Sequence, residues 1–227
     1  SYDTETKALF EQTLELLKAQ GAIIVDQVEL AKMETLEQDE LKVLLTEFKA
    51  DLNFYLTRTP AAVKIRTMAD VIAYNKTHAD KMMPYFAQEL LEQAQATKGL
   101  QDPAYRQASA RIKTTAQNAI MMALNKHKLD ALIAPTTGPA WKIDYTKGDV
   151  VEGAASTPAA VAGYPHLTVP MGLVRGLPVG LSLFSSAWSE ANLLAMGYAF
   201  EQARMPLPLP AMLQTTHLAQ PDAESKP

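Results

Sequence analysis

Cysteine is absent from the 227-residue chain. Its absence excludes disulfide bonds, thiolate catalysis and cysteine-ligated metals, but it does not decide between cytoplasm and periplasm, so the compartment stays open. Long hydrophobic runs are absent as well. The longest, around 129–134, falls far short of the roughly 18 apolar residues of a membrane-spanning helix. The sequence therefore predicts no membrane partner.

A strong charge of one sign is also missing. The 21 Lys and Arg residues nearly balance the 25 Asp and Glu residues, the net charge is −4, and no dense Lys or Arg block occurs. A nucleic acid partner is not predicted, because the phosphate backbone attracts concentrated positive charge. The four histidines have no metal-ligand spacing, and the glycines form no phosphate-binding fingerprint. We therefore expect no metal, nucleotide or other cofactor.

Hydrophobic residues make up 48% of the chain, which is enough to fill a core, and their order along the chain predicts an α/β fold. A helix is expected from Asp3 to a stop at Gly21, and the apolar run Ala22–Val25 predicts a short strand inside a sheet. Four further helical stretches make 39–127 nearly all helix. Their apolar faces lie near 41–56, 67–74, 84–91 and 102–128.

Composition changes at Leu129. Seven of the ten glycines and six of the fourteen prolines lie between Pro135 and Gly180, interleaved with apolar runs, which predicts strands and tight loops. A short helix of small residues is expected over 156–163, and a last helix begins near Ser189. We expect residues 1–214 to form part of one domain and residues 215–227 to form a flexible tail.

Several motifs in this half resemble those of the amidase signature hydrolases. They are Asp130-Ala-Leu-Ile-Ala-Pro135-Thr-Thr-Gly138, Gly163-Tyr-Pro165-His-Leu-Thr-Val-Pro170-Met-Gly172, Gly176-Leu-Pro-Val-Gly180-Leu and Trp188-Ser-Glu190-Ala-Asn-Leu-Leu194, and they occur in the family's order. Ala69-Asp70-Val-Ile-Ala-Tyr-Asn75 is similar to a segment of the peptide-amidase-like members. The resemblance covers nearly the whole chain and roughly the second half of a family member. It implies the carboxy-terminal portion of that fold, with helices on a partial mixed sheet.

The resemblance also implies a chemistry, which is hydrolysis of a carboxamide C–N bond by a Ser-Ser-Lys triad. The family's Gly-Gly-Ser-Ser-Gly-Gly run is absent from this chain, and its catalytic lysine lies still farther upstream in family members. No catalytic residue is therefore assigned here. We expect the chain alone to be inactive, because loss of a nucleophile or base costs orders of magnitude in rate.

The resemblance implies that one wall of the substrate cleft lies in this chain. The candidate residues for binding a small amide substrate are Pro135, Thr136, Thr137, Trp141, Glu152 and Ser156. Three of them also have a structural interpretation: Pro135 can end a strand, Trp141 can anchor a loop, and Ser156 can cap the short helix. Ser185 and Ser186 lack flanking glycines and are interpreted as a loop or helix entry. His166 is interpreted as an oriented polar group.

Two alternatives stay open. The chain could be a self-standing, non-catalytic domain that binds a ligand or protein, or it could be related to the amidotransferases. If it is instead part of an amidase, its partners are the missing amino-terminal half and the amide substrate. A half-fold exposes strand edges and apolar surface, so this interpretation also predicts self-association.

Overall fold

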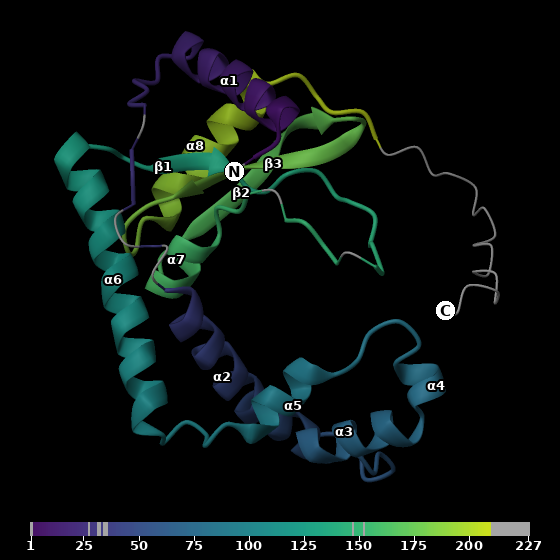
Figure 1. Ribbon diagram of the computed structural model, residues 1–227. Coiled ribbons are helices and arrows are strands. Elements are labelled where there is room, and N and C mark those ends of the chain that lie inside the picture. The colour runs from purple at the N-terminus through teal and green to yellow at the C-terminus, as the bar shows by residue number, and fades with distance from the viewer. Residues whose placement is uncertain are drawn as a thin grey trace.

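The computed structural model describes residues 2–26, 28–30, 33, 36–146, 148–151 and 153–209. Along the described residues, helices α1 to α6 come first, and strands appear only after α6 (Figure 1). The elements are α1 (Thr4–Ala19), α2 (Glu37–Thr57), α3 (Met68–Thr77), α4 (Ala79–Met82), α5 (Glu89–Ala96), α6 (Pro103–His127), β1 (Leu132–Pro135), α7 (Thr157–Ala162), β2 (His166–Val174), β3 (Leu177–Phe184) and α8 (Glu190–Ala203). The α/β class and the partial sheet are confirmed.

The described sheet has the strand order β1-β3-β2. Both pairings are antiparallel, with Leu132 opposite Phe184 at one end and Val174 opposite Leu177 at the other. Arg175 and Gly176 connect β2 to β3 with φ values of 53° and 78°, as a tight hairpin requires. Any parallel pairing of a mixed sheet would need a strand outside the described residues.

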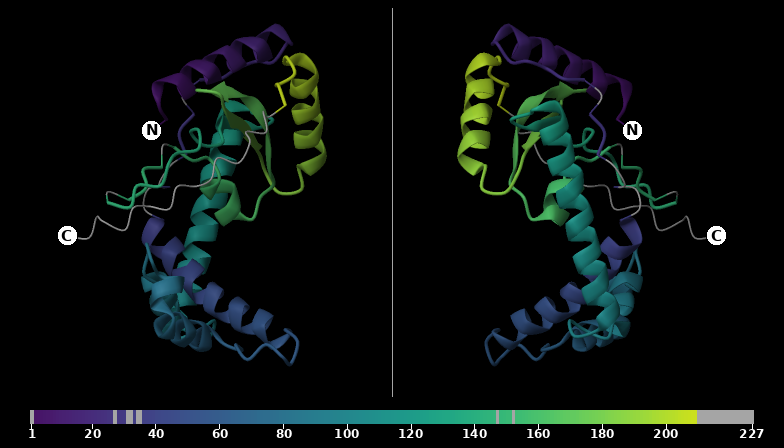
Figure 2. Two further views of the ribbon diagram at one scale, coloured as in Figure 1. Left: turned by 90° about the vertical axis from the view of Figure 1, so that its right-hand side faces the viewer. Right: turned by 90° about the vertical axis from the view of Figure 1, so that its left-hand side faces the viewer.

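The two faces of the sheet bury different cores, because side chains alternate along each strand. Leu181 and Leu183 point to the side covered by α1 and α8, where Leu193 and Phe200 pack against them. Phe184 points to the opposite side and joins a second core with α6 and α7. Figure 2 shows α1 and α8 on one side of the sheet and α6 on the other. Helices therefore cover both faces of the sheet.

Helix α6 follows the sequence prediction closely. The Asp102 carboxylate accepts a hydrogen bond from the Ala104 amide, and Pro103 occupies the first turn. All six residues of the predicted apolar face are buried, and they are Ala108, Ile112, Ala116, Ala119, Ile120 and Leu124. This helix connects the sheet to an arm formed by α2, α3 and α5 (Figure 1).

The arm is held by caps and by its own small core. Thr67 and Asp70 form the predicted capping box at the start of α3, and Met68 beside them is fully buried. The helical stretch predicted at 84–91 is wrong in its first half, since α5 begins at Glu89. The segment 83–88 instead runs irregularly between α4 and α5.

The predicted strand at Ala22–Val25 is wrong for this chain. These residues form no ladder, and the Ile23 side chain is 92% exposed. A buried strand needs backbone partners on a neighbouring strand, and none of the described strands pairs with it. The apolar, β-branched sequence has the character of a strand, but its position in this structure supplies no partner.

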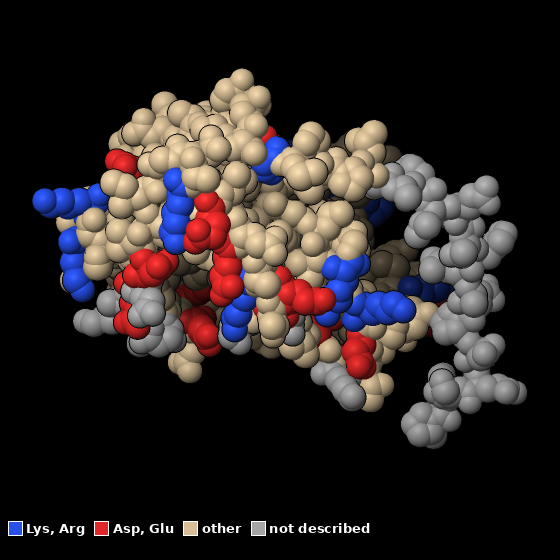
Figure 3. Space-filling view, turned by 90° about the horizontal axis from the view of Figure 1, so that it is seen from above, with Lys and Arg blue, Asp and Glu red and all other residues tan. Residues whose placement is uncertain are grey.

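Charged side chains of both signs are interspersed on the face seen from above, beside a broad uncharged area (Figure 3). Individual ion pairs join distant segments, such as Arg111 with Asp39 at 2.6 Å and Arg175 with Glu5 at 3.2 Å. These side chains are largely exposed apart from Asp39, so the pairs contribute little to stability.

Candidate functional site

The end of β1 meets the turn before α7, and together they form a wall made of Pro135–Thr137 and Gly153–Ser156. The Thr136 amide donates to the Gly180 carbonyl at 2.7 Å, which extends the sheet by one residue. The Thr136 carbonyl accepts from the Ala155 amide at 3.1 Å, and Thr137 bridges Ala154. The structure thus brings Pro135, Thr136 and Thr137 together with the turn that contains Ser156.

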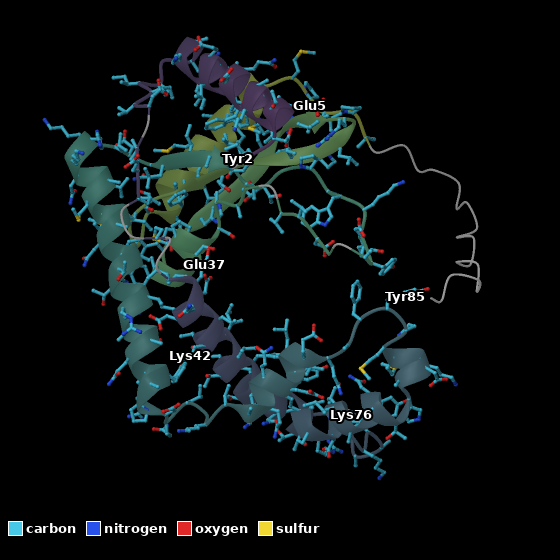
Figure 4. All side chains as sticks on the ribbon, viewed as in Figure 1. Tyr2, Glu5, Glu37, Lys42, Lys76 and Tyr85 are labelled. Carbon is cyan, nitrogen blue, oxygen red and sulfur yellow. The ribbon has the colours of Figure 1, made fainter. Side chains whose placement is uncertain are left out.

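Tyr2 contacts both segments of this wall. Its hydroxyl donates to the Pro135 carbonyl at 2.6 Å, and burial raises the pKa of that hydroxyl, so it remains a donor at neutral pH. Its ring lies against Gly153, where a Cβ would overlap the ring and where φ is +69°. Only glycine satisfies both conditions. Figure 4 shows Tyr2 beside the sheet.

A line of polar side chains crosses the sheet behind the wall. His166 Nε2 lies 2.7 Å from the Ser182 hydroxyl, and that hydroxyl donates to Thr136 Oγ1 at 2.9 Å. Because the Ser182 proton is used toward Thr136, His166 Nε2 is assigned as the donor to Ser182. Ser182 is fully buried, so it orients its neighbours and does not face a substrate. His166 is therefore an oriented polar group, as predicted.

The position of His166 predicts a pH dependence of stability. Desolvation lowers the pKa of His166 below its ordinary value of 6.5 in the folded chain. The unfolded state therefore takes up the proton first as pH falls, and His166 contributes stability above about pH 6.5 that is lost progressively below it. We expect urea midpoints to fall between about pH 7.5 and about pH 5.5, with a smaller fall in His166→Gln. His78→Gln is the control, since exposed His78 bonds only to the nearby Tyr74 carbonyl among the hydrogen bonds of its ring, and an equal flattening there would contradict the assignment.

Trp141 lies apart from the wall. Its indole Nε1 donates to Asp149 Oδ1 at 2.9 Å, which ties the two sides of the 139–151 loop together. The ring lines a separate cavity of about 370 Å³ with Lys142 and Arg175. Trp141 thus has the loop-anchoring contact of its structural interpretation. Glu152, the other candidate from this loop, lies outside the described residues, as does the predicted tail at 215–227.

The serines have structural roles, with one correction. Ser185 is buried and donates to the Asp130 carbonyl at 2.8 Å, while the Ser186 carbonyl accepts from Ser189. The prediction that Ser156 caps α7 is wrong, because its side chain makes no capping hydrogen bond and its backbone is helical (φ −79°, ψ −37°). A capping side chain needs an extended backbone to reach the first-turn amides. Ser156 is exposed at the outer end of the wall.

The described residues contain neither a candidate metal-binding cluster nor a candidate membrane-spanning helix. The described residues contain no group of three His, Cys, Asp or Glu side chains that could hold a metal ion. Among them, no helix combines the length and the apolar composition that crossing a bilayer requires.

Comparison with known proteins gives the family. The family described as Amidase matches residues 1–194. The chain belongs to the amidase family. A probable amidase of Arabidopsis thaliana is 30% identical over 204 residues, which are 87% of this chain and 36% of the plant protein. The crystal structure of the peptide amidase PAM with the competitive inhibitor chymostatin superposes with a TM-score of 0.79 at 46% identity, covering 86% of this chain and 40% of that chain.

These coverages show how much of an amidase is present. The chain spans well under half the length of both relatives. A glutamyl-tRNA(Gln) amidotransferase chain from Clostridium acetobutylicum is 34% identical over 112 residues, which are 47% of this chain and 22% of the clostridial protein. The amidase matches extend over nearly twice as much of the chain, including the helical arm.

Sequence reasoning missed Tyr2 and Ser182. Alternation along the strands does not place His166 and Ser182 on one sheet face, because the pairing of β2 with β3 shifts between Pro170 and Gly172. No pattern in the sequence signals Tyr2, since its partner Pro135 is 133 residues away. Three further aromatic residues, Tyr85, Phe86 and Tyr145, were also missed.

Proposed function

We propose that this chain is the carboxy-terminal portion of an amidase that hydrolyses the C–N bond of a carboxamide. In this proposal the Ser-Ser-Lys residues belong to an amino-terminal portion, and this chain completes the sheet and supplies one wall of the substrate cleft. Similarity to a peptide amidase at 46% identity supports peptide amides as the substrate class. The reaction adds water across the amide and releases a carboxylic acid and ammonia.

The observation that carries this proposal is a groove along the unpaired edge of β1. Within the described residues β1 pairs only with β3, so its other edge has no strand partner. Beside that edge lies a cavity of about 950 Å³, which is large enough for a ligand or a polypeptide segment. It is bounded by α1, the segment 21–26, β1 and Phe184, and we call it the β1 groove.

The lining of the β1 groove is mostly apolar. Phe10, Leu14, Leu17, Leu132 and Ile133 contribute side chains to it. The segment Ala22–Val25 also lines it, with Ile23 pointing into solvent. Exposed apolar surface next to an open strand edge is characteristic of a surface that is covered by another polypeptide segment. This supports an amino-terminal portion as the occupant of the groove.

Two buried serines in and just after β3 support placing the nucleophile elsewhere. A serine nucleophile must reach the substrate carbonyl and pass its proton to a base. Ser182 and Ser185 are buried. The Ser182 hydroxyl donates a hydrogen bond to Thr136 Oγ1, and the Ser185 hydroxyl donates one to the Asp130 carbonyl. The amine of Lys49 donates to the carbonyls of Gln95 and Thr97 in the arm, far along the chain from either serine.

Reconstitution tests the proposal. The chain would be co-expressed with the amino-terminal portion of the peptide amidase, and ammonia release from N-acetyl-phenylalaninamide would be measured. Each part alone is expected to match buffer, whereas the complex is expected to turn over at least about 10³-fold faster, as loss of catalytic groups implies. Enzyme-level turnover by the chain alone would contradict the proposal.

Sedimentation of the chain alone separates this proposal from its alternative. The open β1 groove predicts concentration-dependent self-association, since apolar surface is buried when copies meet. A chain that stays monomeric at high concentration and binds ligand without a partner would favour a self-standing, non-catalytic binding domain.

A further inference from the structure

Three aromatic rings join the helical arm to the 139–151 loop. Tyr85 stacks on Tyr145 with ring centroids 4.7 Å apart and planes at 28°. Phe86 meets the same Tyr145 ring at 5.4 Å and 37°. We call these three residues the aromatic clasp. Figure 4 shows Tyr85 pointing from the arm toward the loop.

Both sides of the aromatic clasp are anchored. On the arm, the nearby Gln88 side chain is buried, accepts from Asn75 at 3.1 Å and donates to the Ile72 carbonyl at 3.2 Å. In the loop, Trp141 bonds to Asp149, and the Gly148 amide donates to the Asp144 carbonyl at 2.9 Å. The rings therefore meet as parts of two braced segments.

The three rings keep exposed surface although they contact one another. Tyr85, Phe86 and Tyr145 remain 53%, 56% and 59% exposed. Ile143 and Trp141 in the same loop are also about half exposed. Large rings that stack on one side and stay open on another offer a platform for a further ring or apolar group.

We propose that the aromatic clasp is a subsite that binds an aromatic or large apolar side chain of the amide substrate. This inference rests on the proposed function and adds a substrate preference to it. A stacked ring gains contact with a flat aromatic face beyond the area it buries. A cationic side chain could also bind over aromatic rings, so an arginine amide is included in the test.

Binding to the 227-residue chain tests the subsite without catalysis. Trp188→Phe leaves Trp141 as the single tryptophan, whose fluorescence reports ligand binding in the loop. We expect N-acetyl-phenylalaninamide to bind about 5-fold to 10-fold more tightly than N-acetyl-alaninamide, in line with the gain from aromatic stacking. Equal binding of the two amides, or tighter binding of N-acetyl-argininamide, would overturn the inference.

Variants then locate the preference. Tyr145→Ala and Phe86→Ala are expected to reduce it to less than about 2-fold, while Tyr145→Phe keeps the ring and the preference. Tyr198→Ala is the matched control, because Tyr198 is 64% exposed on α8 and belongs to neither segment. A preference that survives both alanine variants would exclude the clasp as its source.

The assembled enzyme separates the two proposals. If the complex hydrolyses both amides with equal kcat/KM, the subsite is refuted while the proposed function stands. If the complex is inactive but the isolated chain still prefers the phenylalanine amide, the proposed function fails and the subsite remains. Loss of both results would refute both.

Discussion

Replacing Ile23 with aspartate is expected to leave the chain folded and to weaken its association with an amino-terminal portion by at least about 100-fold. Ile23 is 92% exposed in this structure, so its replacement removes almost no packing within the chain. It nevertheless lines the β1 groove. A partner that fills the groove would have to bury the new carboxylate, which costs several kcal/mol when the charge is unpaired, and about 1.4 kcal/mol equals a tenfold loss of affinity.

The measurement is sedimentation velocity of the chain mixed with the amino-terminal portion, or binding of the chain to that portion immobilised on a surface. Thermal unfolding of each variant is measured alongside. Leu209→Asp is the control, since Leu209 is 91% exposed and does not line the groove. The same pair of variants reports on self-association of the chain. An Ile23→Asp chain that associates as tightly as the control would show that the β1 groove is not the contact surface.

Truncating Ile120 to alanine is expected to lower the free energy of unfolding by about 2–5 kcal/mol, because the side chain is removed from a fully packed interior. Ile120 has no exposed surface and lies where α6 packs in the core shared with α7 and Phe184. Since the whole stability of a domain is only about 5–15 kcal/mol, this single change would remove a large part of it.

Urea unfolding at one low protein concentration provides the measurement, with the change in midpoint converted through a common m value. Met122→Ala on the same helix is the control, because its side chain is 65% exposed, and a change of less than about 0.5 kcal/mol is expected there. Equal losses at both positions would mean that α6 does not pack by the face containing Ile120.

The helices could be predicted because their signals are local. Asp102 and Pro103 mark the start of α6, Thr67 with Asp70 marks the start of α3, and the apolar period of α6 matches its buried face. The boundaries of α4 and α5 were less accessible, because Pro84 is compatible with a first helical turn and equally with an irregular segment.

The errors arise where structure depends on partners far along the chain. Ala22–Val25 has the composition of a strand, but a strand forms only beside another strand, and composition does not reveal whether that neighbour is present. Ser156 precedes a short helix and looked like a cap, yet its backbone is itself helical and its side chain makes no capping hydrogen bond. The clasp between Tyr85 and Tyr145 joins segments about 60 residues apart, and no local pattern encodes it.

The long sequence separation between Tyr2 and Pro135 affects how early their hydrogen bond can form during folding. It joins groups 133 residues apart, which is farther along the chain than the contacts between α2, α5 and α6. Closing a long loop carries a larger entropic cost and slows contact formation, so the arm can form early while the wall must wait. Tyr2 is synthesised before Pro135, and more than a hundred residues are added between them. The hydrogen bond that joins Tyr2 to the wall therefore cannot form until β1 has been synthesised.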